Sequence, residues 1–160
     1  TQIIRFSALS FEQTKVLKPA LPDWIYRSSR GQLDRLDLLS SPEGAAKREE
    51  SLVFFEQFCQ DENFLTDKAW KDLVKDRSWV LFNLNCWLQL VRDAIILKTQ
   101  AKKFILNSDQ VERLKLLYTM SIHKLLWFCD KIILAENDIN SNADAALVFE
   151  DLWVQYARVD

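Results

Sequence analysis

A shortage of turn-forming residues is the sequence feature that most constrains this chain. It contains 2 glycines and 3 prolines in 160 residues, where average usage would give roughly 11 and 8. Strand-rich folds need such residues in quantity, because tight hairpins require backbone conformations with positive φ that glycine adopts at little cost. The sequence therefore predicts an all-α fold with long helices and few turns.

Apolar residues recur at steps of three and four through most of the chain, as on the buried face of a helix. The spacing predicts three short helices within residues 7–46, the last over 32–39. A break is expected at 40–44, where the sequence reads SSPEG. Longer helices are predicted near 46–60, 65–76, 78–102, 109–119, 122–137 and 143–158.

Several polar residues are placed to cap these helices. Ser10 and Gln13 have the spacing of a capping box at the start of the first helix. Ser108, Ser121 and Asn142 precede later apolar runs and are predicted to be N-cap residues.

The chain is predicted to have two parts. Residues 1–46 form a small packet of three helices, preceded by a short β-prone run at 3–6. Residues 47–160 form an antiparallel bundle of five to six helices, since the connections are short. A single strand lacks a pairing partner, so we expect the chain to be a piece of a larger protein.

The charge balance and the placement of the aromatic residues argue against a nucleic-acid platform over the whole surface, and they leave open a local basic edge. Lys and Arg number 21 and Asp and Glu number 23, which gives a net charge of −2. A nucleic-acid surface needs rows of cations to neutralise phosphates. Five tryptophans could stack on bases, but they lie within apolar helical patterns and are predicted to pack in the core; they are Trp70, Trp79, Trp87, Trp127 and Trp153.

No catalytic or metal site stands out. Cys59, Cys86 and Cys129 are widely spaced within apolar runs, so we interpret them as core thiols of a cytoplasmic protein. The single histidine, His123, has no second metal ligand nearby in sequence. Acidic residues such as Asp37 are interpreted as parts of solvated helix faces. Neither a signal peptide nor a membrane-spanning run is recognised.

Three local patterns resemble the C-terminal part of the clamp-loader subunits of bacterial DNA polymerase III, closest to the delta-prime type. The segment IRFSALS (4–10) resembles the strand end that enters the three-helix lid of their AAA+ domain. The segment SSRGQLDR (28–35) is similar to the start of the last lid helix. The segments WLQLVRDAIILK (87–98), NSD (107–109), IN (139–140) and LVFEDL (147–152) look like parts of the helical collar domain.

The resemblance implies a role in assembly without chemistry. Residues 1–46 would be the AAA+ lid-like segment and residues 47–160 the collar, an oligomerisation domain that packs into a ring of five subunits. Within the lid motif, which includes Arg30, Gly31 and Arg35, an aspartate at Asp34 replaces the arginine that nucleotide-sensing relatives carry. The resemblance thus implies neither a nucleotide site nor any other cofactor in this part of the chain.

The implied partners are the gamma/tau and delta subunits of the clamp loader, which loads the sliding clamp onto primed DNA. Contact with the clamp and with DNA would be indirect, and no membrane is involved. Candidate residues facing a neighbouring subunit are Arg92, Lys98 and Trp153. Solvated charges, and a core position for the tryptophan, explain the same three residues without a partner.

Three other interpretations remain open. The chain could be the tail of a gamma/tau-type ATPase subunit, although Asp34 in place of the sensor arginine argues against it. It could be an unrelated helical adaptor that binds a partner helix or peptide in a groove. A helical enzyme is the least favoured, because no nucleophile with a base, carboxylate pair or phosphate loop is recognised.

Overall fold

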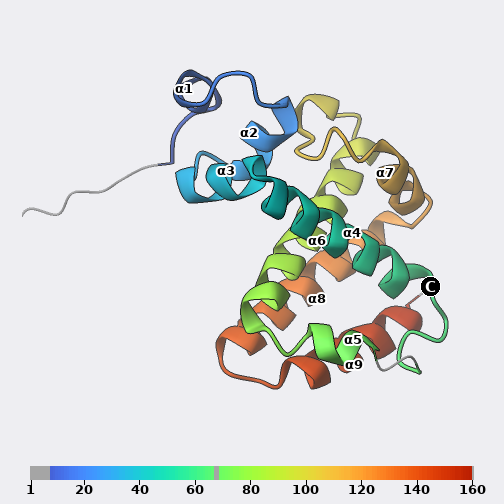
Figure 1. Ribbon diagram of the computed structural model, residues 1–160. Coiled ribbons are helices and arrows are strands. Elements are labelled where there is room, and N and C mark those ends of the chain that lie inside the picture. Colours follow the sequence, from blue (N-terminus) through green and yellow to red (C-terminus); the bar gives the residue numbers. More distant parts are fainter. Residues whose placement is uncertain (1–7, 67–68, 160) are drawn as a thin grey trace, which may run out of the picture.

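The computed structural model describes residues 8–66 and 69–159 (Figure 1). These residues form helices and connecting turns and contain no strand, which confirms the predicted all-α fold. The β-prone run at 3–6 lies outside the described residues. The helices are α1 (Phe11–Leu17), α2 (Asp23–Ser29), α3 (Leu33–Ser40), α4 (Pro42–Gln60), α5 (Ala69–Leu73), α6 (Arg77–Lys98), a 3-10 turn η1 (Lys102–Phe104), α7 (Val111–Tyr118), α8 (Ile122–Asn140) and α9 (Ala145–Ala157).

Helices α4 to α9 share one large aromatic core. Helix α6 packs against α4, α7 and α8, and α8 packs against α9. At the centre the Trp87 ring is fully buried, and its Nε1–H donates to the Ser51 carbonyl at 3.0 Å. The ring centroids of Phe54, Phe55 and Phe58 lie 5.0–5.4 Å from that of Trp87. This arrangement confirms that Trp87 is a core residue, as are Trp70 and Trp79.

Helices α1 to α3, which we call the N-terminal helices, have a separate and much smaller core. Its buried members are Ile25, Tyr26, Leu36 and Leu39. Because this core is small, polar contacts contribute much of its order: the Tyr26 hydroxyl donates to the Lys18 carbonyl at 2.6 Å and accepts from the Leu21 amide at 2.9 Å. In Figure 1 these helices lie at one end of α4, outside the main bundle.

The passage from the N-terminal helices into the bundle differs from the prediction. The expected break is present, since α3 ends at Ser40, but it is shorter than predicted because α4 already begins at Pro42. Ser41 is the N-cap, and its hydroxyl accepts from the Gly44 amide at 3.0 Å. A Cβ on Gly44 would lie 1.8 Å from the Leu38 carbonyl oxygen, so glycine permits this close approach. The predicted division at 46/47 falls inside α4, and the two-domain organisation stays a prediction.

Two of the predicted caps are correct and two are wrong. The capping box of Ser10 and the N-cap of Ser121 are confirmed. Ser108 does not cap α7, which begins at residue 111 without a side-chain cap. Asn142 has φ of +68° in the turn after α8, and Asp144 caps α9 instead.

Helix α6 is long and apolar enough to cross a membrane by length and composition alone. However, 56% of its most apolar window is buried inside the protein, and α4, α7 and α8 pack around it. These are the surroundings of a core helix in a helical bundle.

The helix predicted at 65–76 is shorter in the structure, because within the described residues of this range only α5 is helical.

Candidate functional site

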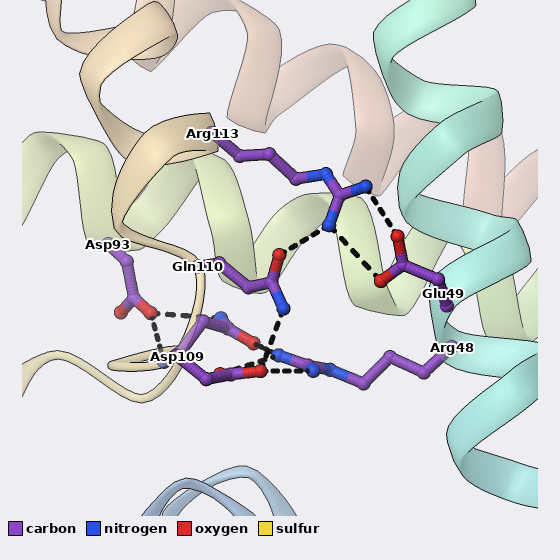
Figure 2. Close-up of polar contacts among 7 residues, drawn as sticks. Arg48, Glu49, Asp93, Asp109, Gln110 and Arg113 are labelled. Carbon is purple, nitrogen blue, oxygen red and sulfur yellow. Dashed lines mark hydrogen bonds and ion pairs between the residues drawn. The ribbon is translucent and has the colours of Figure 1, made fainter.

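A polar junction lies where the N-terminal helices, α4 and the connection between α6 and α7 meet (Figure 2). Its central residue is Arg48 of α4, which is 6% exposed. The Arg48 guanidinium donates to Asp109 at 2.7 and 3.1 Å and to the Asn107 side-chain oxygen at 2.8 Å. The face of the Trp24 ring, from α2, lies 4.0 Å from the guanidinium carbon. One arginine thus connects three segments that are far apart in sequence.

The connection after α6 is held from its other side by a buried carboxylate. Asp93 is fully buried in α6 and accepts from the backbone amides of Leu106 and Asn107 at 3.0 and 2.7 Å. It also accepts from the Asn107 side chain at 2.9 Å and from Arg92 at 2.9 Å. A buried carboxylate is stable only when donors replace its lost water. Asp93 meets this condition and fixes the path of residues 106–107.

A second ion pair joins α4 to α7 beside this junction. Arg113 donates to Glu49 at 2.7 Å and lies 3.1 Å from Glu56. Burial alone would lower the pKa of the Arg113 guanidinium, but hydrogen bonds to the two glutamates and their negative charges raise it above its ordinary value. Figure 2 shows this pair next to Gln110, which accepts from Arg113 and donates to Asp109. The two pairs form one continuous network.

The junction is suited to holding segments together. Its charged groups face one another at hydrogen-bonding distance, which leaves Asp93 and Arg48 saturated by partners within the chain. Among residues 8–66 and 69–159 no three His, Cys, Asp or Glu side chains are grouped to hold a metal ion. Sequence reasoning missed Arg48 and Asp93 as structural residues, although a charged pair at 92–93 inside an apolar run was a visible signal.

The two predicted partner-facing cations make contacts within the chain. Arg92, whose side chain is 39% exposed, bonds to Asp93 and to the Phe104 carbonyl at 3.3 Å. Lys98 donates to the Tyr118 carbonyl at 2.6 Å, and its ammonium lies 4.4 Å from the centre of the Tyr118 ring. These contacts link α6 to η1 and α7, so each side chain has a structural role whether or not it meets a partner.

The predicted partner-facing tryptophan, Trp153, is half-buried in α9. Its ring is nearly parallel to that of Phe64, with centroids 6.3 Å apart. It packs against the edge of the main core, as its core interpretation implied. Part of the ring remains accessible, and its role at an interface stays a prediction.

The lid-like motif forms the turn between α2 and α3. Arg30 is exposed and its backbone adopts the left-handed conformation, with φ of +51°, and Gly31 follows with φ of +75°. A Cβ at Gly31 would lie 2.0 Å from the Leu9 carbonyl oxygen, so only glycine fits here. Arg35 is half-buried on α3, where burial lowers the pKa of its guanidinium and the Cys86 thiol lies nearby. The motif therefore shapes a tight turn.

The three cysteines pack in or against the main core, as predicted. Cys86 is buried, while Cys59 and Cys129 are half-buried. Burial raises the pKa of the Cys59 thiol to about 12 and that of Cys129 to about 11. The thiols are thus protonated and weakly nucleophilic at neutral pH.

Exposed apolar side chains gather on the outer face of α8. Ile122, Leu126 and Ile133, which we call the α8 stripe, are 40%, 48% and 43% exposed. On an ideal helix they lie within roughly 40° of one another, because each residue advances by about 100°. The side chains that α8 buries, such as Phe128, point roughly 120° away from the stripe. The stripe is therefore a distinct surface, separate from the core-facing side.

Comparison with known proteins gives no relative from which to transfer a role. No protein-family model, curated protein or solved structure matches this chain.

Proposed function

We propose that this chain is a non-catalytic assembly part of a bacterial DNA polymerase III clamp loader, of the delta-prime type. In this role it holds neighbouring gamma/tau and delta subunits in a ring. It acts in the cytoplasm, needs no cofactor of its own, and meets the sliding clamp and primed DNA only through its neighbours. The family is suggested by the sequence motifs, and the observation that carries the assembly role is the α8 stripe.

The stripe supports assembly because it exposes apolar area where a solvated helix face carries polar residues. Leu126 and Ile133 are almost half exposed although α8 already has a complete buried face. Covering such side chains stabilises a complex by about 25 cal/mol per Å² of apolar area. Val111 and Tyr118 of the preceding helix α7 are also about half exposed.

The polar junction supports the same role by a different argument. A subunit in a ring must keep the rest of its chain at a fixed angle to its neighbours. Arg48 and Trp24 fasten the N-terminal helices to the bundle, and Arg27 donates to the Lys103 carbonyl at 2.8 Å as a second fastening. These contacts favour a rigid connection between the two regions.

The experiment is sedimentation velocity of this chain with purified gamma/tau-type and delta subunits. We expect co-migration, and we expect the double substitution Leu126→Asp with Ile133→Asp to abolish it while circular dichroism shows the fold retained. Val16→Asp on α1 is the matched control, because Val16 is 82% exposed and far from the stripe in sequence. A folded chain that stays monomeric beside these partners contradicts the proposal.

A further inference from the structure

A groove of about 400 Å³ runs between α8 and α9, on a different side of α8 from the stripe. The two helices are joined by residues 141–144 and run in opposite directions along it (Figure 1). Its apolar surface includes Leu134, which is 52% exposed, and Leu147, which is 65% exposed. From residue 131 to residue 138 the α8 wall is about 10 Å long, or two helical turns.

The rim of the groove is strongly acidic. Asp138, Asp144 and Asp151 lie along it, and Lys131 is the single cation among its lining residues. The surrounding chain has the same bias: residues 125–160 contain seven acidic and two basic residues, so they carry −5 while residues 1–124 carry +3. Apolar side chains inside an acidic rim are complementary to apolar side chains flanked by cations.

The rim carboxylates differ in how many hydrogen bonds they already accept from other residues of the chain. Asp144 accepts from the amides of Ala146 and Leu147 as the N-cap of α9, and Asp151 accepts from Gln155. Asp138 makes no side-chain hydrogen bond or ion pair with any described residue. Asp138 and Asp151 are both exposed, so both can meet an incoming cation without disrupting the fold.

From this geometry we propose that the groove binds a basic amphipathic helix of a partner protein. The helix places two apolar side chains, one turn apart, against Leu134 and Leu147, and its Lys or Arg residues pair with Asp138 and Asp151. A two-turn groove matches such a pair, because residues three or four apart lie on one helix face. This inference does not depend on the clamp-loader assignment, since it concerns another surface.

The test uses a fluorescently labelled synthetic peptide of about 14 residues, long enough to form a helix, with two leucines one turn apart flanked by Lys and Arg. Fluorescence anisotropy should show saturable binding to the full chain. We expect Leu147→Ser to abolish binding, and Asp138→Asn with Asp151→Asn to weaken it about tenfold or more, as for charges paired across an interface. A peptide with Glu in place of its cations should not bind.

Matched controls separate the groove from general charge attraction. Glu43→Gln with Glu50→Gln removes the same charge from exposed positions of α4 and should leave binding unchanged. Ile133→Ser, on the stripe, should also leave it unchanged. Three outcomes would overturn the proposal: equal weakening of binding by the two charge-removing pairs of substitutions, no binding of the peptide, or self-association of the chain that Leu147→Ser abolishes. The last outcome would show that a second copy of the chain occupies the groove. Failure of the stripe experiment would leave this result standing.

Discussion

The bundle and the N-terminal helices are stabilised in different ways. The bundle buries a continuous set of aromatic and aliphatic side chains around Trp87 and Phe58. The N-terminal helices bury only four such side chains. They are fastened to the bundle by the Trp24 ring, which lies against the Arg48 guanidinium, and by the hydrogen bond from Arg27 to the Lys103 carbonyl. Hydrophobic burial scales with the apolar area removed from water, so the bundle should fold without help. The N-terminal helices should depend on their polar contacts for their order.

Trp87→Ala should have the largest effect, because it removes the central ring and its hydrogen bond to Ser51. Loss of a large buried aromatic costs about 3–5 kcal/mol. Urea denaturation followed by circular dichroism should show one transition at much lower denaturant. Trp153→Ala is the control, since this half-buried ring should cost less than half as much. Equal costs would show that the core is not centred on Trp87.

Arg48→Met should release the N-terminal helices while leaving the bundle folded. The substitution keeps an unbranched apolar chain but removes the cation that lies over the Trp24 ring of α2, a contact that contributes about 2 kcal/mol when desolvated. It also removes the hydrogen bonds to Asp109 and Asn107 that hold the guanidinium in place under that ring. Hydrogen exchange should accelerate at residues 11–40 and change little in α6 and α8. Arg113→Met is the matched control and should not accelerate hydrogen exchange in α1–α3. If Arg48→Met instead accelerated exchange throughout the chain, the two regions would unfold together and the prediction would be wrong.

Gly31→Ala should destabilise the N-terminal helices by about 1–3 kcal/mol, because the backbone there is left-handed and a side chain has no room. Arg30→Gly should have the opposite sign and a smaller size, since Arg30 already adopts positive φ, which glycine tolerates at less cost. Local hydrogen exchange of α2 and α3 measures both. The same sign for both substitutions would contradict the role assigned to this turn.

The last effect, which is absent at neutral pH, is a loss of stability at alkaline pH. The Cys59 thiol has a pKa of about 12 when folded and an ordinary value of 9.0. Below pH 9 both states hold the proton; above it the unfolded state loses the proton first, so unfolding becomes more favourable as pH rises. The slope for one thiol is at most about 1.4 kcal/mol per pH unit. Thermal unfolding at pH 8–11 should show a shallower pH dependence for Cys59→Ala, and a smaller change for Cys129→Ala. An unchanged slope in Cys59→Ala would show that this thiol is not protected in the fold.

Sequence reasoning succeeded where the signal is local. The apolar spacing in 78–102 predicted α6 to within a few residues, and the caps at Ser10 and Ser121 followed from their immediate neighbours. It failed at Ser108, whose neighbours Asn107 and Asp109 are held by Arg48 instead of beginning a helix. At 40–44 the expected break is present as the end of α3 at Ser40, but α4 begins earlier than predicted, because Ser41 caps it and Pro42 and Gly44 fit its first turn. At Ser108 contacts with another segment decided the outcome.

By itself, the sequence determined that this protein is helical and that Trp70, Trp79 and Trp87 lie in its core, because backbone propensity and apolar periodicity are properties of neighbouring residues. Only the tertiary structure decided that Arg48 meets Asp109, 61 residues away, and that Asp93 holds the connection after α6. It also decided which apolar faces stay uncovered. The α8 stripe and the groove beside Leu147 exist because the other helices pack elsewhere, and no local pattern contains that information.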